Sequence, residues 1–301
     1  MSAWLVSLEG TAAGRDLAML LALSSALLHA VFGALQKGRH DPWLSRGAMD
    51  LAYGLMAAPF ALFAVPWPGA SLWPILALSF AIHTGYKLVQ AAAYARGAFT
   101  VVYPIVRGTG PVFTVIGAWL LFSERFTPMQ WLGVALLAGG ILGLAACNIR
   151  TMRLEGATLL PALALAVPTG GLVAAYTTWD AYGIRASADP FTFLAWLFFL
   201  DGLLVMPAIA FWRWRRMADA PAVAPLALRG VSGGLVALLG FGGIMLATRL
   251  DKVGEAAVLR ETSVVFAALI GWLLLKENVG PGRFALVALI AAGAVIVEIG
   301  G

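Results

Sequence analysis

Two arginines lie within long apolar runs of this sequence, Arg107 in residues 98–122 and Arg260 in residues 254–275. A charged side chain at the centre of a bilayer costs about 2.5–3.5 kcal/mol on insertion scales, so such residues usually have a function. The planar guanidinium group binds carboxylates and phosphates through two parallel hydrogen bonds. We therefore predict that Arg107 and Arg260 form a paired anion site near the middle of a membrane.

The alternative is that each arginine belongs to a structural ion pair. Glu261 follows Arg260 directly, and consecutive residues of a helix point about 100° apart. The sequence therefore predicts that Glu261 points away from Arg260 and does not pair with it.

A polar stripe runs along the apolar segment 72–94, at the three- and four-residue spacing of one helix face. It comprises His83, Tyr86, Lys87 and Gln90. A polar face on a spanning helix is expected to line a water-filled cavity, and we predict that these side chains bind substrate. For Lys87 the alternative is an ion pair with one of three aspartates, Asp50, Asp180 or Asp201.

Further candidates for substrate binding lie in the segments 159–183 and 17–36. Tyr176 and Asp180 share one helix face, and Asp180 either binds a proton or pairs with an arginine. Trp179 is predicted as a wall residue, because aromatic surfaces shape mostly apolar pockets. His29 is predicted to face the same cavity, with a satisfied interior histidine as the alternative.

Four residues are predicted to have structural roles. Pro104 and Pro111, with glycines between them, are expected to loosen the segment 98–122, whereas 254–275 lacks these prolines. Glu124 and Glu277 each follow an apolar run and are expected to tie the ends of neighbouring segments together.

Enzymatic and metal-dependent chemistry is disfavoured by the residue inventory. The three histidines are scattered, no nucleophile motif accompanies them, and the only cysteine is Cys147 in an apolar run. No grouping has the spacing of a zinc site, so we expect neither a metal nor a cofactor.

The elements that must position these side chains are spanning helices. Hydrophobic residues make up 61% of the 301 residues and charged residues 12%, whereas soluble proteins carry about 25% charged residues. Runs of about 20 apolar residues recur, too long and too uniform for the strands of a β-barrel. The net charge of +5 is spread between these runs, which argues against a nucleic-acid partner. Ten spans are predicted, at residues 17–36, 46–66, 72–94, 98–122, 128–147, 159–183, 191–212, 230–249, 254–275 and 281–299.

The two halves of the chain repeat each other. The segment VVYPIVRGTGPVFTVIGAWLLFSERFTPMQWLGVALLAGG aligns without a gap with GEAAVLRETSVVFAALIGWLLLKENVGPGRFALVALIAAG. An offset of 153 residues pairs Arg107 with Arg260, Trp119 with Trp272, Glu124 with Glu277, and Pro128 with Pro281. Five spans per repeat make the halves, residues 1–150 and 151–301, inverted, as in many secondary transporters.

These motifs resemble the EamA-type branch of the drug/metabolite transporter superfamily. The resemblance rests on ARGAFTVVYPIVRGTGP and LLFSERFTPMQWLGVALLAGG in the first half. In the second half it rests on ATRLDKVGEAAVLRETSVVFAALIGWLLLKE and PGRFALVALIAAG. The resemblance implies ten helices and the export or exchange of a metabolite, but it implies no particular substrate.

The sequence as a whole predicts a monomeric secondary transporter in a bacterial inner membrane. Its substrate would be a small polar, anionic or zwitterionic metabolite moved by alternating access, with protons or a counter-substrate as coupling. An uptake carrier or a channel is the alternative. Twelve Lys and Arg residues lie at one set of span ends and five at the other, so the positive-inside rule places both termini outside the cytoplasm.

Overall fold

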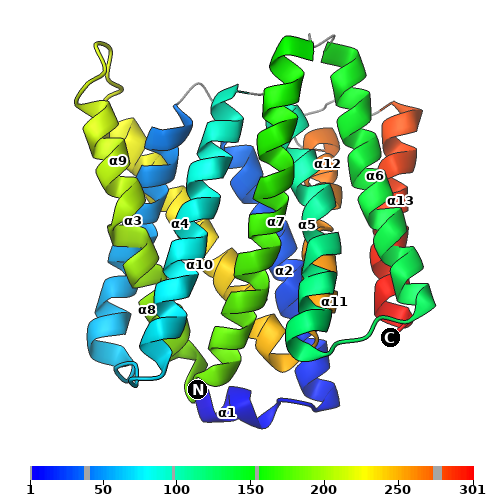
Figure 1. Ribbon diagram of the computed structural model, residues 1–301, viewed down its shortest axis with the longest axis horizontal. Coiled ribbons are helices and arrows are strands. Elements are labelled where there is room, and N and C mark those ends of the chain that lie inside the picture. Colours follow the sequence, from blue (N-terminus) through cyan, green and yellow to red (C-terminus); the bar gives the residue numbers. More distant parts are fainter. Residues whose placement is uncertain (1, 37–40, 97–98, 153–155, 274–279) are drawn as a thin grey trace.

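A computed structural model describes residues 2–36, 41–96, 99–152, 156–273 and 280–301, and all regular elements in those ranges are helices. Its helices run roughly side by side, and both ends of the chain lie at the same end of the bundle (Figure 1). An even number of spans requires this arrangement of the termini.

Helices correspond to all ten predicted spans. In the first half they are α1 (Ser2–Ser7), α2 (Ala12–Gln36), α3 (Pro42–Pro59) with the π-helical turn η1 (Phe60–Ala64), α4 (Leu72–Arg96), α5 (Phe99–Phe122) and α6 (Pro128–Met152). In the second half they are α7 (Gly156–Ala186), α8 (Pro190–Leu203), α9 (Val205–Trp214), α10 (Val223–Leu250), α11 (Val253–Arg260), α12 (Ser263–Leu273) and α13 (Pro281–Ile299). The short helix α1 precedes the first span.

Among the described residues, eight helical segments are long and apolar enough to cross a membrane. The sixth and ninth predicted spans are not among them. The sixth corresponds to α7, which carries the buried polar residues Thr169, Thr177 and Asp180. The ninth span is divided between α11 and α12, each of which is too short by itself.

Two helices, α3 and α8, begin where an aspartate precedes a proline. Asp41 accepts hydrogen bonds from the backbone N–H groups of Trp43 and Leu44 at the start of α3. Asp189 accepts one from Phe191 at the start of α8. The proline at the first position of each helix has no N–H group to leave unsatisfied, so both sequences favour a helix start.

The last helices of the two halves, α6 and α13, pack closely against each other. They touch through glycines: a Cβ atom on Gly293 would lie 2.6 Å from the carbonyl oxygen of Gly133. Small residues allow such close approach of helix backbones in membranes. The same device joins α3 to α10, where Gly230, Gly233 and Gly234 pack against the backbone and side chains of α3.

The predicted loosening of residues 98–122 is wrong. α5 continues through Pro104 and Pro111, held between α6 and α7. The interruption lies instead in the ninth span, where α11 ends at Arg260 and α12 begins at Ser263. There the Thr262 hydroxyl group donates to the Leu259 carbonyl oxygen at 2.6 Å, and such side-chain bonds compete with regular helix geometry.

Candidate functional site

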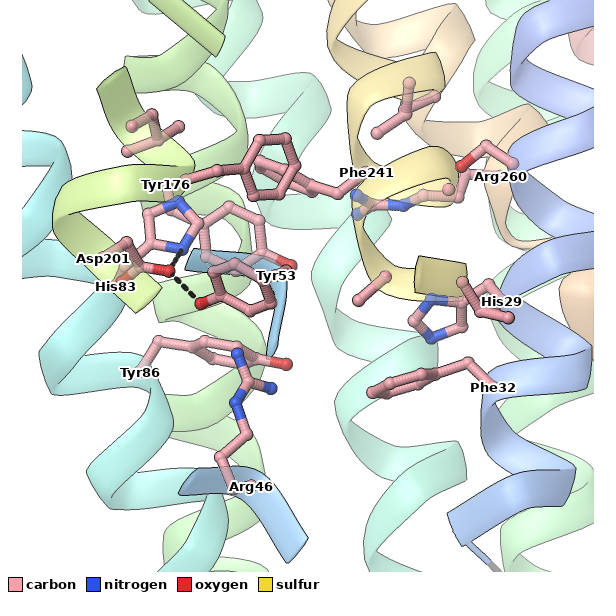
Figure 2. A pocket seen from close by; sticks show the side chains of 17 residues that line it. His29, Phe32, Arg46, Tyr53, His83, Tyr86, Tyr176, Asp201, Phe241 and Arg260 are labelled. Carbon is pink, nitrogen blue, oxygen red and sulfur yellow. Dashed lines mark hydrogen bonds and ion pairs between the residues drawn. The ribbon is translucent and has the colours of Figure 1, made fainter. Parts of the chain in front are cut away.

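A cavity of about 100 Å³ lies inside the bundle, between both halves of the chain. Its polar lining comprises Ser25 and His29 of α2, Arg46 and Tyr53 of α3, His83 and Tyr86 of α4, Tyr176 of α7, Asp201 of α8 and Arg260 of α11. Phe32, Phe198 and Phe241 contribute aromatic surface. Arg260 and His29 lie on one side of the cavity, and His83, Tyr86 and Asp201 lie on the other (Figure 2).

On the first side, Arg107 and Arg260 are brought together by a shared carboxylate. Nη1 of Arg107 lies 2.8 Å from Oε1 of Glu261, and Nε of Arg260 lies 3.7 Å from the same oxygen. The prediction that Glu261 points away from Arg260 is therefore wrong. The helical angle does not apply because α11 ends at Arg260, so Glu261 belongs to the interruption.

Arg107 is supported from its own helix and from α2. Its Nε donates to the Tyr103 hydroxyl group at 3.4 Å, and its guanidinium lies 5.6 Å from the centre of that ring. The His29 ring stacks on Tyr103 with a centroid distance of 6.3 Å. His29 itself lines the cavity, whereas Arg107 lies just behind the lining, in contact with it through Glu261.

On the second side, Lys87 lies beneath the cavity wall and is 1% exposed. Its ammonium group donates to Asp50 at 2.5 Å, to Asp201 at 2.6 Å and to the Tyr53 hydroxyl group at 2.7 Å. An ammonium group has three hydrogens, so these bonds use its donors. The structure thus places Lys87 where it holds Asp201 and Tyr53, which do line the cavity.

His83 lies over Asp180 at the cavity wall. Its Nε2 is 2.6 Å from a carboxylate oxygen of Asp180, and its Nδ1 is 4.0 Å from one of Asp201. The Tyr176 ring lies next to His83, with a centroid distance of 4.6 Å. His83 and Tyr176 therefore face the cavity, and Asp180 lies one layer behind them.

Tyr86 completes this wall. Gln90 donates a hydrogen bond of 2.5 Å to the Tyr86 hydroxyl group, so it too lies behind a lining residue. The guanidinium of Arg46 lies 5.9 Å from the centre of the Tyr86 ring, and its Nε is 2.8 Å from Asp50. Of the polar stripe on α4, His83 and Tyr86 line the cavity, whereas Lys87 and Gln90 lie behind the lining. That these residues bind substrate stays a prediction.

Several lining residues were not predicted as site residues, and Arg46, Tyr53 and Asp201 have the strongest hydrogen-bonding capacity among them. Arg46 stands at the start of the predicted span 46–66, where an arginine is expected from membrane topology alone. Asp201 was considered solely as a partner for Lys87, although a carboxylate inside an apolar run was itself a signal. Tyr53 has no sequence signal of this kind.

The model of the EamA-like transporter family matches residues 16–146 and 160–299. The chain belongs to this family. One match in each half agrees with the inverted five-helix repeats, and the family consists of membrane transporters and not enzymes. No curated protein matches the sequence.

Among solved structures, 29 chains are similar to this EamA-like transporter. One of them, titled "Crystal structure of protein", has a TM-score of 0.74 and 18% identity, covering 95% of this chain and 98% of that chain. At this identity the likeness shows a shared fold.

Two further predicted residues of this EamA-like transporter, Trp179 and Glu124, are not part of the cavity lining. The Trp179 indole donates to the Ile75 carbonyl oxygen at 3.1 Å, and its ring lies beside Tyr182. Glu124 accepts hydrogen bonds from the N–H groups of Val253 at 2.9 Å and Gly254 at 3.0 Å. It thereby joins the end of α5 to the start of α11, whereas Glu277 lies outside the described residues.

A metal ion has no evident site in the part of the chain that the structure describes. No group of three or more His, Cys, Asp or Glu side chains there has the arrangement needed to hold one. The chemistry available to the cavity is therefore ion pairing, hydrogen bonding and contact with aromatic rings.

Proposed function

We propose that this EamA-like transporter moves a small anionic or zwitterionic metabolite by alternating access, as an exporter or an exchanger. The observation that carries the proposal is Arg260, a cavity-lining arginine that is 4% exposed. Its Nε has no hydrogen-bond partner among the described residues. A buried guanidinium with unused donors favours a bound carboxylate or phosphate.

The opposite wall of the cavity supports a zwitterionic substrate in particular. Three carboxylates there, those of Asp50, Asp180 and Asp201, accompany two permanent cations, Arg46 and Lys87. Oδ1 of Asp201 has no hydrogen-bond partner in the described part of the chain. A substrate ammonium group would bind this wall while its acidic group binds Arg260.

The aromatic residues define the rest of the substrate. Tyr176 and Phe241 pack against the His83 ring, and Phe198 lies between Phe241 and Tyr53, with centroid distances between 4.6 and 5.9 Å among neighbouring rings. Such walls favour a solute with an apolar portion between its charged groups. All of these residues belong to one chain, so we propose that a monomer suffices.

The experiment is transport by purified protein in liposomes, screened over amino acids, organic acids and phosphorylated solutes. We expect saturable flux of an anionic or zwitterionic class, and Arg260→Gln to reduce it by about tenfold or more. Arg15→Gln, which changes an exposed arginine at the start of α2, is the matched control. Absence of flux for every class, or normal flux by Arg260→Gln, would refute the proposal.

We also propose the boundary between the two repeats and the orientation of the protein in the membrane. We assign the repeats to residues 1–150 and 151–301, because the two family matches leave 147–159 between them. We place the protein in a bacterial inner membrane with both termini outside the cytoplasm. The arginines at the α9–α10 connection support this orientation, since they lie at the end of the bundle opposite the termini (Figure 1).

A further inference from the structure

The anion site proposed above is already occupied by an anion from the protein itself. Oε1 of Glu261 lies 2.8 Å from Arg107 and 3.7 Å from Arg260. All three side chains are buried, with exposed fractions of 5% or less. A substrate carboxylate that binds this arginine pair must compete with Glu261.

The cluster is incompletely satisfied, unlike a closed structural ion pair. Nη2 of Arg107, Nε of Arg260 and Oε2 of Glu261 are all buried without a hydrogen-bond partner within the described ranges. Two guanidinium groups share one carboxylate, which leaves one positive charge in surplus. A second anion would satisfy both the free donors and the charge.

Glu261 is also where the two repeats differ. The offset of 153 residues pairs Arg260 with Arg107, but it pairs Glu261 with Gly108. A Cβ atom on Gly108 would lie 2.9 Å from the side chain of Leu142, so a side chain there would require Leu142 to move. This side of the cavity therefore has a repeated pair of arginines, Arg260 in the lining and Arg107 behind it, with a single carboxylate between them.

Glu261 lies at the break between α11 and α12. Glu261 caps α11 and its N–H group donates to Val258 at three-residue spacing, outside the regular helical ladder. Its carbonyl oxygen accepts from Val264 in the same tight spacing at the start of α12. A change in its torsion angles would reorient α11 against α12 without unwinding either helix, as hinge residues do.

We propose that Glu261 is a tethered competitor, a carboxylate that occupies the Arg107–Arg260 site until an anionic substrate displaces it. The inference rests on the proposed function, because it presumes that substrate anions bind this pair. A solute must displace Glu261 from the two arginines in order to bind, and an uncharged solute does not compete for them. This displacement also connects substrate binding to the interruption between α11 and α12.

The test measures binding by isothermal titration calorimetry on detergent-purified protein, with benzoate as the anionic probe and benzamide as its uncharged counterpart. Glu261→Gln should bind benzoate about tenfold or more tightly than the wild type, because the competitor has lost its charge. Benzamide binding should not change. Glu298→Gln removes an exposed carboxylate from α13 and is the matched control.

A second comparison covers the case in which Glu261→Gln does not fold. Arg107→Gln leaves Arg260 paired with Glu261, so benzoate binding should be lost. Adding Glu261→Gln to Arg107→Gln leaves Arg260 unpaired. The cluster then has the same surplus of one positive charge as in the wild type, so benzoate binding should return. A purely structural role for Glu261 predicts that the double variant is no better than the single one.

The outcomes separate the two proposals. If the wild type binds benzoate and Glu261→Gln binds it equally or more weakly, Glu261 is not a competitor. The proposed anion site would still be supported by the binding to the wild type. Tighter binding by Glu261→Gln, or its recovery in the double variant, supports the competitor. If neither the wild type nor any Glu261 variant binds benzoate, the proposed anion site is wrong. The proposal that Glu261 competes for that site is then wrong as well.

Discussion

Lys87 carries a positive charge in the interior of the bundle, and two aspartates from other helices neutralise it. Asp50 belongs to α3 and Asp201 to α8, so the lysine connects three helices through its ammonium group. The desolvation of such a cluster is offset only while all its members are present. Its contribution is to fix where Tyr53 and Asp201 face the cavity.

Replacing this lysine should therefore destabilise the protein. Lys87→Met keeps much of the side-chain volume but removes the cation of the buried Asp201 and leaves Asp50 with Arg46 alone, at a cost of about 3–5 kcal/mol. Thermal unfolding in detergent would measure the loss. Lys252→Met is the control: that lysine is 41% exposed beside Glu255, and the expected effect is about 0–1 kcal/mol. Equal unfolding midpoints for both variants would contradict this reading of Lys87.

Residue type and position within an apolar run were enough to single out Arg107, Arg260, Lys87 and Asp180 from the sequence. Their partners were not predictable in the same way. Lys87 had three candidate aspartates, and the choice depends on how distant helices are rotated and shifted against each other. Glu261 was misplaced because its direction was calculated for a helix that ends one residue earlier.

At the scale of elements, glycines decide how closely helices approach each other. A Cβ atom on Gly202 would lie 2.6 Å from the Asp50 carbonyl oxygen and 2.6 Å from Cα of Gly54. This contact holds α3 against α8, and it brings Asp50 and the neighbouring Asp201 within reach of one lysine.

Gly202→Ala should force these two helices apart. We expect a loss of about 1–3 kcal/mol in stability, as for other overpacked interiors, together with weaker substrate binding. Gly139→Ala, in α6, is the control because a Cβ atom there would meet nothing within 4 Å. Comparison of the two unfolding midpoints is the measurement, and a Gly202→Ala protein as stable as the control would show that α3 and α8 can separate freely.

The start of α11 depends on a side chain from the other repeat. Glu124→Ala removes the acceptor for the N–H groups of Val253 and Gly254, at a cost of about 0.5–2 kcal/mol. Hydrogen exchange of α11 followed by mass spectrometry should show faster exchange in this variant. Asp219→Ala, in the exposed α9–α10 connection, should leave exchange in α11 as it is. Unchanged exchange in Glu124→Ala would exclude the capping role.

The helices could be predicted from the sequence, because ten long apolar runs are separated by proline and aspartate signals. The interruptions within spans could not be predicted in this way. Pro104 and Pro111 suggested a break in α5, but packing in the bundle keeps that helix continuous. The actual break at Glu261 and Thr262 lacks proline and glycine, and it depends on a buried ion pair with a distant helix.

At the scale of the whole molecule, orientation in the membrane follows from charge. We expect Ala218→Cys, in the α9–α10 connection, to resist a membrane-impermeant maleimide added to intact cells, and Thr11→Cys to react. Both positions are exposed, and Cys147 would first be replaced by serine. Both should react in permeabilised cells. The opposite pattern in intact cells would invert the orientation.

The architecture of the whole chain was the most predictable part. The repeat at an offset of 153 residues and the odd number of spans per half together imply inverted topology, and the family matches in both halves agree with it. The chemical asymmetry of the cavity was less visible. It arises from single residues such as Glu261, which has glycine as its counterpart.

The surplus charge between Arg107, Arg260 and Glu261 has an electrical consequence. A unit charge that crosses the full membrane field gains or loses about 2.3 kcal/mol per 100 mV. The opposite wall carries one surplus negative charge, because Asp50, Asp180 and Asp201 accompany only Arg46 and Lys87, so the two surpluses cancel in the empty cavity. A bound monovalent anion gives the loaded form one net charge, whereas a zwitterion adds none. Membrane voltage would therefore favour one direction for net transport of an anion and leave transport of a zwitterion unaffected.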